Sequence, residues 1–202
     1  MAWVPSTEEQ AAANAVVLNL QNSGISQAQF FRLCRDNPGL RMELSAQKEL
    51  IIMPLPGART SWRNAIITTE LTNWARKNGT GLTFDCACLF ILPNGANRAP
   101  DAAWVRRKRW DALTPERQEN GAPLCPDFVI ELMSISDRLE VVKEKMDEYI
   151  ANGARLGWLI DPYQKQVYVY RSRKPVQRVE NPVTISGDPV LPGFLFNVAE
   201  IW

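Results

Sequence analysis

The chain has 202 residues, of which 46% are hydrophobic and 22% are charged, and its formal net charge is +1. This length suits one domain over residues 1–202, and the composition excludes a globally disordered chain. The near-neutral charge excludes a bulk positive field, so any contact with nucleic acid must use a local basic patch.

Histidine is absent from the sequence. Its absence excludes Ser-His-Asp and Cys-His nucleophiles, histidine general bases and histidine-rich zinc hydrolases. Any catalysis must therefore use carboxylates, lysine, hydroxyl groups or a hard metal ion. The four cysteines form no CxxC pair, no apolar run approaches the roughly 18 residues of a membrane span, and the N-terminus lacks a signal-peptide pattern. We expect a cytoplasmic protein without a membrane segment.

Two helices are predicted before the first strand. One covers residues 6–24, within an N-terminal helical extension of residues 1–25, and the other covers residues 26–39. Each begins at a serine or threonine that can cap it and ends at a glycine. Apolar residues at helical spacing predict a longer helix further on. The two short strands that follow and this longer helix are predicted over residues 40–44, 49–55 and 61–79.

The second half of the chain predicts a sheet and one more helix. A helix beginning near Asp137 has an apolar stripe along one side, and residues 161–165 (DPYQK) form the turn of a hairpin. Residues 190–202 read as an apolar closing segment. The pattern of helices, antiparallel strands and a strand–helix–strand unit indicates one α/β domain with a mixed sheet. The strands are predicted over residues 82–92, 99–105, 126–133, 156–161 and 166–171.

Two carboxylates, Asp127 and Glu131, lie in one of these apolar strands. They project to the same face but roughly 13 Å apart, so one Mg²⁺ with ligands at about 2.1 Å cannot contact both. Asp101, after a proline at the start of the preceding strand, supplies a closer partner for Glu131. Asp127 then caps the strand or supports a ligand. Each acid taken alone also fits a structural role at a turn or strand end.

These segments resemble a known family. The motifs are "NRAPDAAWV", "PDFVIELMSISD", "KEKMDEYIANGARLGWLIDP" and "VYVYR". Together they resemble the Uma-two family of restriction-endonuclease-like proteins, which is abundant in cyanobacteria and belongs to the PD-(D/E)XK nuclease superfamily. The match runs from about Ser26 to the C-terminus. It implies a restriction-endonuclease-like core, with a mixed central β-sheet flanked by α-helices.

The resemblance also implies a metal site. Enzymes of the superfamily hold Mg²⁺ with an aspartate on one strand and an acidic residue on the next, followed two residues later by a lysine. Asp101 matches the aspartate and Glu131 the second acid, but Met133 stands at the lysine position. This is a departure from the superfamily pattern.

The family pattern K-x-x-x-Y implies a substitute lysine on the following helix. It matches Lys145 and Tyr149, with Lys143 as the competing candidate. By default a helical lysine is a solvated surface group, so the family pattern alone selects Lys145. Glu43 and Glu70 are further candidates for a metal ligand.

The resulting expectation is an endonuclease that uses Mg²⁺ (or Mn²⁺) to hydrolyse DNA, with RNA left open as a substrate. A homodimer is expected because superfamily nucleases often use two sites to cut two strands. The alternative is a catalytically inactive module that binds nucleic acid or protein, which Met133 and the near-neutral charge favour. A structural dimerisation domain is the third interpretation.

Overall fold

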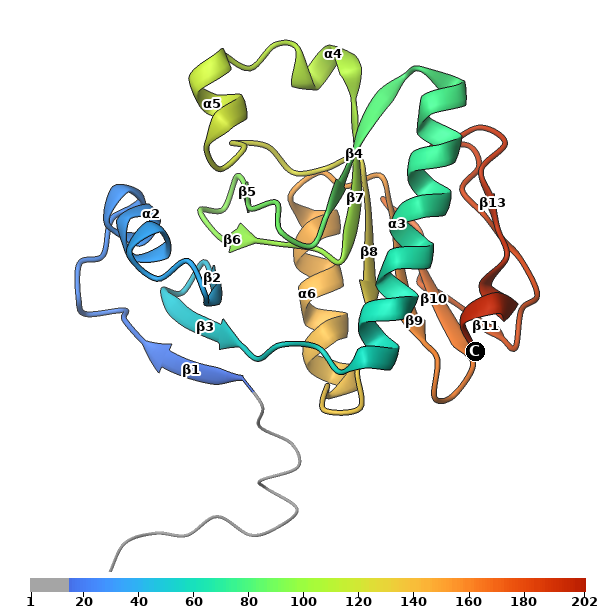
Figure 1. Cartoon of the computed structure of the whole chain (residues 1–202), viewed down its shortest axis with the longest axis horizontal. Coiled ribbons are helices and arrows are strands. Elements are labelled where there is room, and N and C mark those ends of the chain that lie inside the picture. The colour runs from blue at the N-terminus through green and yellow to red at the C-terminus, as the bar shows by residue number, and fades with distance from the viewer. Residues whose placement is uncertain (1–14) are drawn as a thin grey trace, which may run out of the picture.

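The computed structural model describes residues 15–202, which form two main β-sheets with helices around them (Figure 1). All neighbouring strands of the larger sheet are antiparallel except β8 and β9, which run parallel. The mixed sheet is therefore confirmed. Its spatial order is β11 (Gln177–Glu180), β10 (Gln166–Arg171), β9 (Leu156–Asp161), β8 (Phe128–Leu132), β7 (Ala102–Arg106) and β4 (Gly81–Asp85).

The parallel pair is the predicted strand–helix–strand unit. Helix α6 (Leu139–Ala151) connects β8 to β9 and packs on one face of the sheet. Gly157, in β9, permits this packing because a Cβ at that position would collide with the Met146 side chain of α6. The following hairpin, β9 to β10, is confirmed as well.

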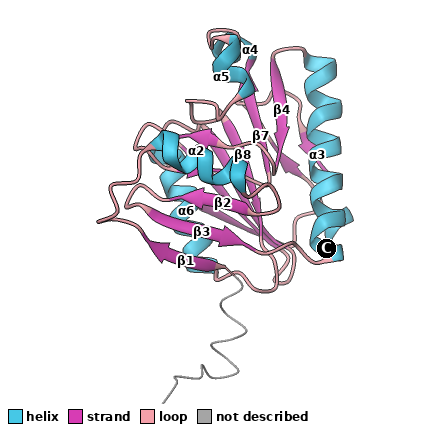
Figure 2. Ribbon diagram, turned by 60° about the vertical axis from the view of Figure 1, so that its left-hand side comes forward, coloured by secondary structure: helices cyan, strands magenta, loops and turns pink. Residues whose placement is uncertain are grey.

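The smaller sheet lies on the other side of α6, beneath helix α2 (Gln27–Asp36), as Figure 2 shows. Ser26 caps α2 through a reciprocal pair of bonds with Gln29, which confirms the predicted start of this helix. The buried apolar residues of the smaller sheet pack under α2 and form a separate hydrophobic cluster with it. The strands are, in spatial order, β1 (Val16–Asn19), β3 (Glu49–Met53), β2 (Arg41–Leu44), β6 (Asn97–Arg98) and β5 (Phe90–Ile91).

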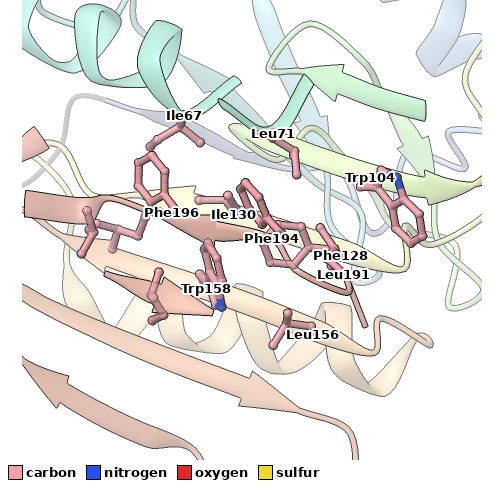
Figure 3. Packing of buried hydrophobic residues seen from close by; sticks show 14 of the residues in the cluster. Ile67, Leu71, Trp104, Phe128, Ile130, Leu156, Trp158, Leu191, Phe194 and Phe196 are labelled. Carbon is pink, nitrogen blue, oxygen red and sulfur yellow. The ribbon is translucent and has the colours of Figure 1, made fainter. Parts of the chain in front are cut away.

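Helix α3 (Ala58–Asn78) covers the face of the larger sheet that is opposite α6. It ends where Gly79 adopts a left-handed conformation with φ 71°. The apolar core on this face also contains the C-terminal segment, which confirms that residues 190–202 close the fold. Figure 3 shows Trp158 beside Phe194 and Phe196 within this core.

The prediction of an N-terminal helix is wrong in the part of that segment that the structure describes. Residues 1–14 lie outside the described part of the chain, and Val16–Asn19 form strand β1 rather than helix. Two β-branched valines favour the extended conformation, and pairing with Ile51 and Ile52 of β3 satisfies the backbone. Tertiary pairing thus outweighs the capping signals.

The strand predicted over residues 82–92 is interrupted. It consists of β4 and β5, separated by a turn at residues 86–89. Asp85 causes the break because its side chain accepts the Ala87 N–H at 3.0 Å, a local turn that competes with the strand. Within residues 15–202, no helix has the length and apolar character needed to cross a bilayer.

Candidate active site

The two predicted metal ligands lie side by side at one end of the larger sheet. Ala102 of β7 pairs with Ile130 of β8 in an antiparallel register, and one further step places Asp101 opposite Glu131. Directly opposed residues have Cβ atoms about 4.5–5.5 Å apart. Asp101 Oδ2 also accepts the Leu132 N–H at 2.9 Å. Two carboxylates distant in sequence therefore meet on the face that α6 covers.

Lys145 reaches this pair from α6. Its Nζ lies 2.9 Å from Glu131 Oε1 and 2.9 Å from Glu43 Oε1. Met146 and Tyr149 fix the orientation of the helix because they are buried against the sheet. Lys145 lies at the edge of this buried stripe, so its side chain extends into the site.

Lys143, the competing lysine, lies elsewhere. Its Nζ pairs with Glu140 of the same helix at 3.1 Å and lies over the ring of Tyr168 at 5.1 Å. The structure thus brings Lys145, and not Lys143, to Asp101 and Glu131.

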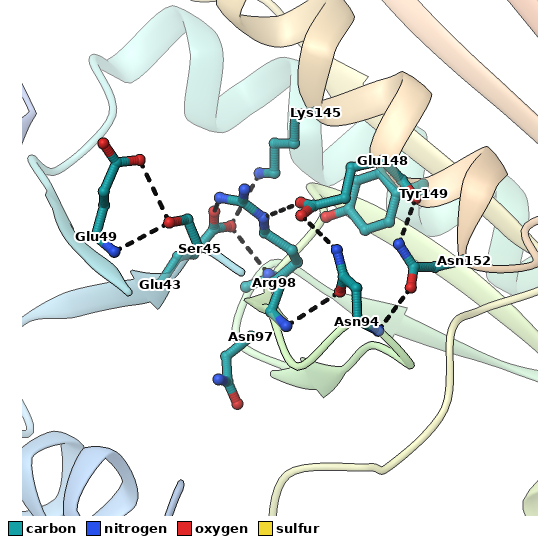
Figure 4. Close-up of polar contacts among 12 residues, drawn as sticks. Glu43, Ser45, Glu49, Asn94, Asn97, Arg98, Lys145, Glu148, Tyr149 and Asn152 are labelled. Atoms are coloured by element: carbon teal, nitrogen blue, oxygen red, sulfur yellow. Dashed lines mark hydrogen bonds and ion pairs between the residues drawn. The ribbon is translucent and has the colours of Figure 1, made fainter. Parts of the chain in front are cut away.

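Glu43 of β2 is 2% exposed and both of its oxygens are occupied (Figure 4). Oε1 accepts from Lys145 Nζ and from the Ala99 N–H, and Oε2 pairs with Arg98 at 3.1 Å. Arg98 pairs in turn with Glu148 of α6. Glu43 therefore holds two cations in place and joins the smaller sheet to α6.

Glu131 has one occupied and one open oxygen. Oε1 accepts from Lys145 and from the hydroxyl of Tyr149 at 3.1 Å. No hydrogen bond from the described residues reaches Oε2. The lysine and the tyrosine of the K-x-x-x-Y pattern therefore bind the same oxygen, and Glu131 presents the other one.

The charges shift the pKa values of these groups in opposite directions. Burial, together with the negative charges of Asp101 and Glu43, raises the pKa of Glu131 to about 7, against the lowering effect of Lys145. Although burial alone would raise the pKa of Glu43, Lys145 and Arg98 hold it below its ordinary value. At neutral pH Glu43 is thus ionised, whereas Glu131 is present in both its protonated and its ionised form.

Burial also raises the pKa of Asp101, although the Leu132 N–H and Lys145 oppose the shift. Both members of the carboxylate pair therefore bind protons more readily than a solvated acid does. A bound cation would displace those protons, because it favours the ionised form.

Three predicted residues lie outside the pair. Met133, at the superfamily lysine position, is buried in the core beside α6. Glu70 is exposed on α3 and forms no ion pair among residues 15–202. Asp127 precedes β8, where its Oδ2 accepts the Arg106 N–H at 3.0 Å and pairs with Arg109 of α4 (Arg107–Trp110) at 2.9 Å.

Asp127→Ala should reduce the free energy of unfolding by about 2 kcal/mol and leave metal binding unchanged. The substitution removes the buried acceptor of the Arg106 N–H, and it leaves the partly buried Arg109 without its carboxylate partner. Urea unfolding measures the first effect and calorimetric titration with Mg²⁺ the second. Loss of metal binding in a folded variant would instead place Asp127 in the metal site.

Three contributors escaped sequence reasoning: Arg98, Asn64 and Glu148. Asn64 donates from Nδ2 to Asp101 Oδ1 at 3.1 Å, and its own Oδ1 is buried without a hydrogen-bond partner among the described residues. Nothing in one sequence marks an asparagine on a long helix or an arginine in a two-residue strand as part of a site. Only the tertiary arrangement identifies them.

Comparison with known proteins identifies the family and a similar fold. Residues 27–199 match the model of the Uma2 family, described as "Putative restriction endonuclease". The fold is similar to the crystal structure of "a putative nuclease belonging to DUF820" from Anabaena variabilis, with a TM-score of 0.68 and 18% identity, covering 79% of this chain and 88% of that one. No curated protein matches the chain. Because the family model covers most of the sequence, the resemblance found in the motifs is confirmed, and the chain belongs to the Uma2 family.

Proposed function

We propose that this chain is a Mg²⁺-dependent endonuclease that hydrolyses phosphodiester bonds of DNA, with Asp101, Glu131 and Lys145 at its centre. The observation that carries the proposal is the meeting of two opposed carboxylates with a lysine whose Nζ lies 2.9 Å from Glu131. The three groups come from two strands and a helix, and a purely structural role would not require all of them at one place.

The residues fit a magnesium ion. No group of three or more His, Cys, Asp or Glu side chains within residues 15–202 could hold a metal, but Mg²⁺ is commonly bound by one or two carboxylates together with waters and substrate phosphates. Asp101 and Glu131 would supply the carboxylates. The buried, unpartnered Oδ1 of Asn64 beside Asp101 offers a neutral oxygen, either to the ion or to one of its waters.

The charge balance supports the same assignment. Four carboxylates, from Glu43, Asp101, Glu131 and Glu148, face the two buried cations Arg98 and Lys145. Arg41 of β2 adds a third positive charge near Asp101. One negative charge is therefore left over in a region of low dielectric constant, which is costly in the absence of a counter-ion. A bound cation would compensate for it. Mn²⁺, which favours the same oxygen ligands, would substitute for Mg²⁺.

When bound, Mg²⁺ supplies a Lewis acid for a phosphoryl oxygen and lowers the pKa of a coordinated water. The chain provides the rest. Lys145 has three N–H donors, of which Glu131 and Glu43 accept two. The third can donate to a phosphate oxygen and stabilise the charge that develops during attack. Tyr149 and Glu43 keep Glu131 and Lys145 in position.

DNA as substrate and a homodimer are part of the same proposal. The support for DNA is the membership in a family described as "Putative restriction endonuclease". A homodimer would supply two such centres, one for each strand of a duplex. Hydrolysis of RNA instead of DNA by the wild-type protein would correct the substrate and leave the centre unchanged.

The test is calorimetric titration with Mg²⁺ of the wild type and of Asp101→Asn. The variant keeps the acceptor for Leu132 and should fold, but we expect its affinity to fall by at least about tenfold because a neutral amide replaces a charged ligand. The matched control is Asp111→Asn, which changes the net charge equally at an exposed position. Unchanged affinity in Asp101→Asn, or no Mg²⁺ binding by the wild type with DNA present, would overturn the proposal and favour the inactive binding module.

A further inference from the structure

Arg41 faces the candidate active site from β2. Side chains alternate along a strand, and Met42 and Leu44 point into the core of the smaller sheet. Arg41 and Glu43 therefore share the opposite face. Because Glu43 contacts Lys145, this face of β2 is directed toward the candidate active site.

The guanidinium of Arg41 is anchored near the start of β7, which Asp101 precedes. Its Nη2 donates to the carbonyl oxygen of Cys86 at 3.3 Å. Asp85, the residue before Cys86, pairs with Ala102, the residue after Asp101, so this carbonyl belongs to the turn beside the start of β7. The arginine thus lies against the strand end that carries the carboxylate pair.

Arg41 differs from the other two cations of the site in having no carboxylate partner. Arg98 and Lys145 each pair with two glutamates. No carboxylate oxygen of the described residues lies within 4.0 Å of the Arg41 guanidinium, and the side chain is half-buried. Of its five N–H donors, the Cys86 carbonyl uses one. The anchored guanidinium of Arg41 therefore has free N–H donors near Asp101 and Glu131.

A phosphate is the ligand that such a group suits. Guanidinium binds phosphate oxygens through two parallel hydrogen bonds, and it remains charged at every physiological pH. An ordinary solvated arginine would have neither the fixed carbonyl anchor nor this proximity to the acids.

We infer that Arg41 binds a backbone phosphate of the DNA strand held at Asp101 and Glu131. The inference rests on the proposed function, and it assigns the substrate phosphate to a residue that supplies no metal ligand. Arg41 is thus a substrate-binding residue, distinct from Lys145, whose donors are mostly committed to the carboxylates.

The experiment compares DNA binding by the wild type, Arg41→Gln and the control Arg76→Gln. Arg76 is exposed in the last turn of α3, about 18 Å along the helix from Asn64, and its substitution changes the net charge equally. The probe is a fluorescein-labelled duplex DNA, with Ca²⁺ replacing Mg²⁺ to prevent cleavage, and anisotropy is recorded between about 50 and 200 mM salt.

We expect Arg41→Gln to bind the duplex about tenfold more weakly, with the slope of log affinity against log salt reduced by about one, as for the loss of one phosphate contact. Arg76→Gln should bind like the wild type. Calorimetry should show that Arg41→Gln keeps its Mg²⁺ affinity, because no ligand is lost.

Two results would overturn the inference by itself. One is unchanged DNA affinity and salt slope in Arg41→Gln, and the other is a loss of Mg²⁺ affinity that fully accounts for weaker binding. Failure of the wild type to bind both Mg²⁺ and DNA is a different result, since it removes the proposed function as well. A thermal melt of each variant establishes that the comparison is between folded proteins.

Discussion

Lys145→Met is expected to slow DNA hydrolysis by about 10²–10³-fold, whereas Lys143→Met leaves the rate unchanged. The two lysines lie on one helix, and methionine preserves most of the apolar stem in both cases. Lys145 contacts Glu131 and Glu43, while Lys143 contacts Glu140 and Tyr168 at the surface. The same chemical change therefore tests two different environments.

The stability of the two variants should differ as well. Removing Lys145 leaves Glu43 and Glu131 facing each other without the cation between them, which we expect to cost about 3 kcal/mol of unfolding free energy. Lys143→Met removes an exposed pair and should cost less than about 0.5 kcal/mol.

Single-turnover cleavage of a linear duplex DNA with Mg²⁺ measures the rate, and urea unfolding measures the stability. A folded Lys145→Met protein that cleaves at the wild-type rate would reduce Lys145 to a structural counter-ion. Loss of cleavage in Lys143→Met alone would reassign the catalytic lysine.

Glu131→Gln should make the metal-free protein more stable at about pH 8 while it abolishes Mg²⁺ binding. The pKa of Glu131 is raised to about 7 in the folded protein, from an ordinary value of 4.5. At a pH between these two pKa values, Glu131 is therefore protonated in the folded state and ionised in the unfolded chain. Stability consequently falls as the pH rises from 4.5 through 7, and the loss is complete above 7.

Glutamine resembles the protonated acid, so it avoids this loss. We expect a gain of about 2 kcal/mol at about pH 8, or about 6 °C in Tm, which shrinks towards zero below about pH 4.5. Differential scanning calorimetry across this range measures the gain. With Mg²⁺ present, the wild type should recover stability by mass action and the variant should not. A variant that is less stable than the wild type at high pH would show that the ion pair with Lys145 outweighs burial.

The sequence predicts the larger part of the fold. Strong periodicity and end signals locate α2, α3, α6 and the strands of the larger sheet, because local propensity and packing agree there. They disagree at Val16–Asn19, where helix-start signals precede a β-branched segment that pairs with β3. Whether such a segment pairs depends on a partner more than thirty residues away, and local patterns do not contain that information.

In the candidate site as well, local patterns predict some residues, whereas others depend on contacts between distant parts of the chain. Asp101 and Glu131 could be predicted because strand alternation and a preceding proline carry spatial information. The choice of Lys145 over Lys143 needed the family pattern, since both fit a solvated helix face. The sequence offers Glu43 as a candidate metal ligand, and in the structure its carboxylate pairs with two cations, which depends on Arg98 reaching it from β6. Register within a sheet can be inferred, but contacts between two sheets cannot.

The bond between Glu43 and Lys145 joins residues 102 positions apart. During synthesis, the strand that carries Glu43 leaves the ribosome long before α6, so the cluster cannot close until most of the chain has emerged. A truncated or proteolysed chain that lacks either part would contain no complete centre. Under the proposed function, the ability to cut DNA would therefore arise only when folding is complete.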